Sequence, residues 1–288
     1  RLGGGPSSYR VNPTGDPPST RNTALVPSPT DVYLGLTDLP YVGTVRAGYQ
    51  REPIGLERAN SARFLAFLER SYLFDLNPST AFSSNRSPGV VALRTFADDR
   101  VFASVGAFKT VTNQFGYGIG DGEYAVTGRV TGTPVWRPEG KQFWHVGGAM
   151  SVRDPVDGQT RVRARSLVRN APGPFLPVVA DTGVLNSDRQ TLFDVETAYV
   201  QGPLTLQAEY MANVVRGASI VRTAPLGDVL LDGWYAEALV FLTGESRGWR
   251  VKSATFDRVR PRSPLRLEGG VPTGWGAWEV GVRYSHLD

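Results

Sequence analysis

Strict alternation of apolar and polar residues is the feature that most constrains what this chain can fold into. Residues 204–214 show it most clearly. In an extended chain, one face would carry Leu204, Leu206, Ala208, Tyr210, Ala212 and Val214. The other face would carry Thr205, Gln207, Glu209, Met211 and Asn213. Residues 44–52 and 278–285 alternate in the same way. Because a period of two puts each set on its own side of a sheet, the pattern predicts amphipathic β-strands.

Several segments of this kind follow one another, separated by turn residues. Many approach the roughly 9–11 residues that a tilted strand needs to cross a bilayer. Strands of about 5–6 residues are more usual in soluble sandwiches. The predicted strands are 31–36, 44–52, 89–96, 100–110, 124–136, 143–154, 159–168, 191–202, 204–217, 231–246 and 277–288. The sequence therefore predicts an all-β, antiparallel fold.

The apolar faces of these strands are modest, and many of their members are Ala, Val and Tyr. A packed sandwich core needs bulkier side chains to reach native density, whereas lipid requires no close fit. Tryptophans near the strand ends suit the aromatic girdles of a membrane barrel, namely Trp136, Trp144, Trp234, Trp275 and Trp278. Ordinary aromatic residues beneath a soluble sheet remain the alternative.

Composition excludes several other classes of protein. The chain has no cysteine and only two histidines, His145 and His286, which leaves little for zinc or for histidine acid–base chemistry. A net charge of +4 is too small and too dispersed to indicate nucleic-acid binding. No nucleotide-binding or hydrolase motif is present. Glu196 and Glu209 could form a catalytic carboxylate pair, but they are more simply read as solvated wall residues. We therefore expect no enzyme, no metal and no cofactor.

Two segments depart from the strand pattern. Residues 1–30 are rich in Gly, Pro, Ser and Thr, which predicts a flexible segment before a β domain over 31–288. A long connection from Pro53 to Pro88 contains the second segment, residues 58–75. Its large apolar residues stand at helical spacing, namely Phe64, Leu65, Phe67, Leu68 and Tyr72.

Four segments resemble the phosphate-selective porin O and P family. They are DVYLGLTDLPYVGTVRAGYQREPIGLE (31–57), FLERS (67–71), GWYAEALVFLTGESR (233–247) and GAWEVGVRYSHLD (276–288). The resemblance covers most of 31–288. It implies a trimeric outer-membrane β-barrel of about sixteen strands that favours phosphate or other anions. By that resemblance the chain would supply only the middle strands, so a partial barrel is expected.

Anion selectivity requires positive charge where the pore is narrow. In TRVRARSLVR, Arg161, Arg163 and Arg165 would form a ladder about 13 Å long on one face of a strand. Each arginine would cost about 2–4 kcal/mol on the lipid face near the midplane, so we expect the three to face the pore. A solvated loop or strand tip is the alternative.

Other arginines are candidates for the same role. The alternation also puts Arg46, Arg129, Arg153 and Arg283 on the pore side, together with Glu52, Glu196, Glu209, Glu237 and Glu279. The resemblance further implies that the helical loop folds inward and narrows the pore, which would bring in Arg58, Arg63, Arg70 and Arg86. An extracellular cap, or a helix packed on a soluble sheet, is the alternative for this loop.

The function predicted from these features is passive diffusion of small anions such as phosphate through a water-filled barrel. The expected partners are outer-membrane lipid, small anions and two further copies in a homotrimer. Two alternatives stay open: a soluble or surface β-sandwich that binds carbohydrate, and an outer-membrane barrel with a structural role and no conducting pore.

Overall fold

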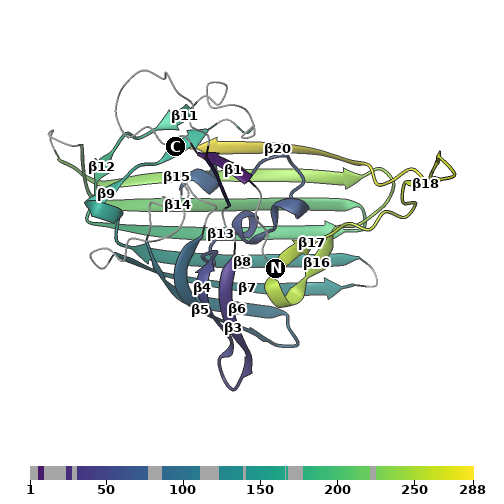
Figure 1. The fold of residues 1–288 in the computed structure, drawn as a ribbon, viewed down its shortest axis with the longest axis horizontal. Helices are drawn as coiled ribbons and strands as arrows, with labels where there is room; N and C mark the ends of the chain where they lie inside the picture. The colour runs from purple at the N-terminus through teal and green to yellow at the C-terminus, as the bar shows by residue number, and fades with distance from the viewer. Residues whose placement is uncertain are drawn as a thin grey trace.

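The computed structural model describes residues 6–9, 24–27, 31–76, 86–110, 123–138, 141–165, 167, 178–220 and 225–288. Ten long strands dominate these residues (Figure 1). They are β3 (Val32–Leu39), β4 (Gly43–Gln50), β5 (Ser87–Phe96), β6 (Val101–Lys109), β7 (Tyr124–Arg137), β8 (Gln142–Arg153), β13 (Arg189–Gln201), β14 (Leu204–Ile220), β15 (Pro225–Phe241) and β20 (Glu279–Leu287).

The remaining elements are short. The paired strands are β1 (Pro6–Tyr9) with β2 (Ala24–Pro27), β10 (Arg163–Arg165) with β11 (Val178–Asp181), β16 (Gly248–Arg250) with β17 (Thr255–Asp257), β18 (Arg266–Glu268) with β19 (Val271–Thr273), and β9 (Gln159–Thr160) with β12 (Leu185–Asn186). The helical turns are α1 (Leu56–Ala59), α2 (Leu73–Leu76), η1 (Ala62–Phe64), η3 (Val156–Gly158) and η5 (Val251–Ser253).

The long strands form one antiparallel sheet in the order β20-β15-β14-β13-β8-β7-β6-β5-β4-β3, and β9 and β12 join it beside β14. The described sheet is open between its edge strands β3 and β20. Among the residues that the structure describes, no helix has the length and apolar character needed to cross a membrane. The prediction of a nearly all-β, antiparallel fold is confirmed.

The strand predicted over residues 159–168 is wrong as a single element. Its two ends belong to different sheets, since β9 pairs with β12 and β10 pairs with β11. The backbone N–H of Val162 donates to Thr182 Oγ1 at 3.0 Å, and Arg161 and Arg163 both pair with the Asp181 carboxylate. These contacts draw the chain away from the main sheet toward β11, so the three arginines do not stand on one long wall strand.

The two faces of the main sheet have the reverse of the polarity expected in a water-soluble protein. On β13, Val195 is 63% exposed, whereas Asp194 and Glu196 on the opposite face are each 2% exposed. The same inversion recurs on neighbouring strands, where the outward-facing members include Val105, Val126, Val130, Leu206, Val280 and Val282. These apolar side chains are exposed rather than packed under a second sheet. Such a face is stable in hydrocarbon, and this is the arrangement of a membrane barrel wall.

The opposite face, here called the inner face, is covered by residues 51–76, which we call the inward segment (Figure 1). Ile54, Leu73 and Leu76 from this segment are buried against the sheet residues Leu192 and Met211. The segment therefore folds onto the inner face.

The helical spacing of residues 58–75 corresponds to short helical turns, α1, η1 and α2, rather than to one long helix. Asn60, Ser61 and Leu65 have extended backbone conformations that separate α1 from η1 and end η1. The reason lies in side-chain bonding that competes with the helix. The Ser61 hydroxyl accepts a bond from the Arg63 backbone N–H, and Asn60 Oδ1 accepts one from the Phe256 backbone N–H at 2.9 Å.

The two ends of the sheet differ in their connections. At one end, the strands are joined by short connections at residues 40–42, 97–100, 138–141 and 202–203. At the other end, three connections are much longer, at 51–86, 110–123 and 154–188, and a fourth, 221–224, is short. One long connection, residues 242–278, leaves the short-turn end. Short turns are typical of the periplasmic end of such barrels.

Candidate functional site

A buried charge network spans three adjacent strands on the inner face. Arg129 Nη2 lies 2.5 Å from Glu196 Oε1, and His145 Nε2 lies 2.7 Å from the same oxygen. All three side chains are buried. Arg129 also donates to the Ala254 carbonyl at 3.2 Å. The network therefore neutralises Arg129 and ties the wall to the hairpin Gly248–Asp257, which we call the inner hairpin.

Glu209, the direct cross-strand neighbour of Glu196, anchors the inward segment. Its Oε2 accepts bonds from the Glu57 backbone N–H at 3.1 Å and from the Tyr235 hydroxyl at 2.9 Å. Gly55 has a φ of +76°, and a Cβ added there would lie 2.4 Å from Glu209 Oε1. A glycine is needed at this position so that the backbone can approach the carboxylate. The two glutamates thus have structural partners on the wall and the inward segment.

Five arginines gather where the inward segment leaves the wall, and we call them the arginine cluster: Arg51, Arg58, Arg70, Arg86 and Arg153. Arg86 and Arg153 have carboxylate partners among the described residues. Arg86 binds both oxygens of Asp31, at 2.9 and 2.8 Å, and Arg153 is paired with Glu52. A third carboxylate, that of Glu57, lies near Arg70.

Arg51 and Arg58 are bound differently, because neither forms an ion pair with a described carboxylate. Arg51 Nη1 donates to the carbonyl oxygens of Arg58, Ala59 and Asn60 at 3.1, 3.4 and 2.8 Å. Arg58 is 2% exposed, and none of its guanidinium nitrogens has a hydrogen-bond acceptor among the described residues. Its guanidinium lies 5.4 Å from the centre of the Phe74 ring.

Burial lowers the pKa of Arg58 to about 9, an effect that the neighbouring Glu52 opposes and Arg153 reinforces. Burial also lowers the pKa of Arg51 to about 10, and the positive charge of Arg86 adds to the shift. The lowered pKa of each arginine means that the surrounding protein does not fully compensate the loss of hydration of its charged form. An anion at this point would supply the missing charge.

The other predicted pore residues lie elsewhere on the inner face. Arg46 is half-buried, with its guanidinium 5.0 Å from the centre of the Tyr33 ring. Arg283 pairs with Glu57 at 3.1 Å and donates to the Glu69 carbonyl at 2.8 Å. The inner face therefore also carries Arg46, Arg129 and Arg283 outside the arginine cluster. Arg63 is exposed, and none of its described contacts joins it to the cluster.

Of the arginines predicted as a ladder, Arg163 and Arg165 lie in β10, and Arg161 lies just before it. Arg161 Nη2 and Arg163 Nε lie 2.6 and 3.0 Å from Asp181 Oδ2. The hydrogen bond from Arg161 lowers the pKa of Asp181. Arg165 is opposite Val178 in the same pair of strands. Their contribution to anion selectivity stays a prediction.

Sequence reasoning missed two parts of this interior. Arg51 is not among the predicted pore residues: it lies within the strand predicted at 44–52, whereas β4 ends at Gln50 and Arg51 begins the long connection. The inner hairpin was also overlooked, together with a cavity of about 430 Å³ beside it whose lining includes Arg258, Arg260 and Arg262. The signal that could have found the hairpin is the length of the 242–278 connection and its dense arginines.

Comparison with known proteins gives three matches. The family model described as "Phosphate-selective porin O and P" matches residues 8–288. "Porin O" of Pseudomonas aeruginosa is 26% identical over 248 residues, which is 81% of this chain and 52% of that protein. An "Uncharacterized protein" of Caulobacter vibrioides is 28% identical over 232 residues, covering 77% of this chain and 42% of that protein. The chain thus spans about half the length of the curated relatives it matches.

Proposed function

Because this chain belongs to the phosphate-selective porin O and P family of outer-membrane proteins, we propose that it forms part of the wall and the constriction of a channel. The channel passes small anions, phosphate among them, by passive diffusion. The wall is the main sheet, whose apolar face meets lipid and whose polar face meets water. The inward segment and the inner hairpin narrow the passage. No cofactor is required for diffusion, and the assembly proposed from the family is a homotrimer.

The arginine cluster is the observation that carries the anion preference. An ion entering a narrow passage loses hydration, and guanidinium groups replace part of it with charge-assisted hydrogen bonds. Five arginines face the carboxylates of Asp31, Glu52 and Glu57, and Glu57 is shared with Arg283. The net charge of these groups is positive. The nearby carboxylates keep the attraction for an anion weak enough that the anion can be released.

The experiment is a reversal-potential measurement on the full protein in planar bilayers under a potassium chloride gradient. Replacing Arg51, Arg58 and Arg86 with Gln should lower the permeability of chloride relative to potassium. Replacing Glu52 with Gln should raise the permeability of chloride relative to potassium, because the substitution removes a negative charge while keeping a side chain of similar volume. Phosphate added to the chloride bath should reduce conductance less in the triple variant than in the unmodified protein.

A second variant distinguishes the contribution of the arginine cluster from that of the predicted ladder. Replacing Arg161, Arg163 and Arg165 with Ala tests the ladder under the same conditions, and the ladder hypothesis expects a lower anion preference there. Gel mobility before and after heating verifies that each variant is folded. Reversal potentials that do not change in the folded cluster variant would refute the role of the cluster. Absence of ion steps from the full trimeric protein would favour the structural barrel instead.

A further inference from the structure

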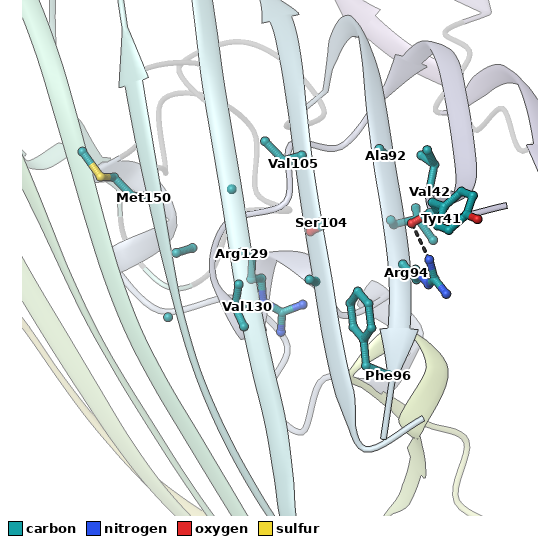
Figure 2. Close-up of a pocket in the computed structure, with 15 residues that line it drawn as sticks. Tyr41, Val42, Ala92, Arg94, Phe96, Ser104, Val105, Arg129, Val130 and Met150 are labelled. Carbon is teal, nitrogen blue, oxygen red and sulfur yellow. Dashed lines mark hydrogen bonds between the residues drawn. The ribbon is translucent and has the colours of Figure 1, made fainter. Parts of the chain in front are cut away.

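A depression of about 630 Å³ lies on the outward, lipid-facing side of the sheet (Figure 2). We call it the outer groove. Its small residues include Ala103, Gly128 and Gly148, and its larger apolar residues include Val105, Val130 and Met150. Its volume is within the range of roughly 300–1,000 Å³ that is usual for small-molecule sites. Its lining is almost entirely apolar.

The strand register explains why the wall is hollow at this place. Val105, Gly128 and Met150 are direct cross-strand partners, and so are Ala103, Val130 and Gly148 in the next outward-facing row. Small residues therefore alternate with large ones across β6, β7 and β8. The glycines leave space between neighbouring side chains that a flexible hydrocarbon chain can fill.

A cation stands at the rim of the outer groove. Arg94 is directly opposite Ala103, on the outward face of β5, close to the short turn at 97–100. Its Nη1 donates to the Tyr41 carbonyl, and its guanidinium lies 5.2 Å from the centre of the Phe96 ring (Figure 2). Asp99 in that turn is bonded to Thr95 and paired with Lys252. The arginine is thus held in place without a carboxylate of its own among the described residues.

An arginine on the lipid-facing side is costly in hydrocarbon and tolerated near the headgroups. A guanidinium has five N–H donors in a planar arrangement that matches a phosphate group, and one of those of Arg94 is used by Tyr41. The short turns place this end of the sheet at the periplasmic side, where the headgroups are those of phospholipids.

We propose that the outer groove binds one phospholipid of the periplasmic leaflet, with an acyl chain along the small residues and the phosphate on Arg94. This site depends on the membrane location of the sheet. It does not depend on ion conduction, so failure of one proposal leaves the other standing.

The test is native mass spectrometry of the full protein, released from detergent after incubation with phosphatidylglycerol. Arg94→Gln should weaken retention of one lipid per chain about tenfold, as expected for loss of a charge-assisted bond. Gly128→Leu should weaken it similarly by filling the groove, and a Cβ there would approach no closer than 3.7 Å to its nearest neighbour. Diacylglycerol, which lacks the phosphate, should be retained weakly by all forms.

Two control variants match these changes. Gly132→Leu adds the same side chain to the same strand where a Cβ would have nothing within 4 Å, and Arg216→Gln removes an exposed arginine from the far end of β14. Both should retain phosphatidylglycerol fully. Equal retention by all four variants would overturn the proposal. Loss of oligomer mass in Gly128→Leu with unchanged lipid retention would show instead that another copy of the chain occupies the groove.

Discussion

At the scale of single residues, the interior is organised by buried charges that hold distant segments together. Glu196 binds Arg129 and His145 at once, and Glu209 binds the backbone of the inward segment. Such groups lose hydration when they are buried, and only close partners compensate for that loss. Most inner-face charges are therefore already satisfied, whereas Arg51 and Arg58 form no ion pair with a carboxylate of the described residues.

Arg129→Ala should destabilise the folded protein by about 3–5 kcal/mol, because it leaves Glu196 buried without its main cation. The free energy of unfolding in detergent or lipid, measured by denaturant titration, checks this value. Arg161→Ala is the matched control, since its pair with Asp181 is solvent-exposed and should contribute little. Equal effects of the two substitutions would contradict the proposed energetic role of the buried network.

At the scale of elements, two connections from opposite ends of the sheet meet on the inner face. Phe256 of the inner hairpin is 1% exposed, and its ring centre lies 5.1 Å from that of Trp249 and 6.1 Å from that of Phe143. Its backbone N–H donates to Asn60 in the inward segment. The two segments therefore stabilise each other and form one connected layer on the inner face.

Phe256→Ala should increase single-channel conductance, because the inner hairpin loses its aromatic anchor and leaves the passage wider. Planar-bilayer recordings of the full protein provide the measurement. Phe193→Ala removes an equally large ring from the outward face of β13 and should leave conductance unchanged. A Phe256→Ala channel with unaltered conductance would show that the hairpin does not limit ion flow.

At the scale of the whole molecule, the dominant fact is the inverted polarity of one broad sheet. Its apolar outward face would be an aggregation surface in water and is stable only in contact with hydrocarbon. The polar inner face needs water or the bonded side chains of the two inward-folded connections. A sheet that stands between lipid and water gives the apolar face its hydrocarbon contact and the polar face its hydration.

Val195→Arg, on the outward face of β13, should cost about 2–4 kcal/mol if that position is near the bilayer midplane. Folding yield into lipid vesicles and the free energy of unfolding measure this cost. Val195→Leu keeps the side chain apolar and should fold as the unmodified protein does. Full stability of the arginine variant in lipid would show that this face does not contact hydrocarbon.

Alternation in the amino-acid sequence was enough to predict ten of the long strands and the residues that share each face. That information is local, because backbone geometry turns a period of two directly into two faces. It also predicted that Arg46, Arg129, Arg153 and Arg283 share the polar face, as the register places them.

Which of these charges form pairs depends on contacts between segments that are distant in the sequence. Arg129 reaches the Ala254 carbonyl 125 residues away, and Asn60 reaches Phe256 across 196 residues. Arg161 and Arg163 lie outside the main sheet, where they form ion pairs with Asp181 of another segment. Strand register and the paths of long connections set such pairings, and both depend on contacts between segments that no local pattern encodes.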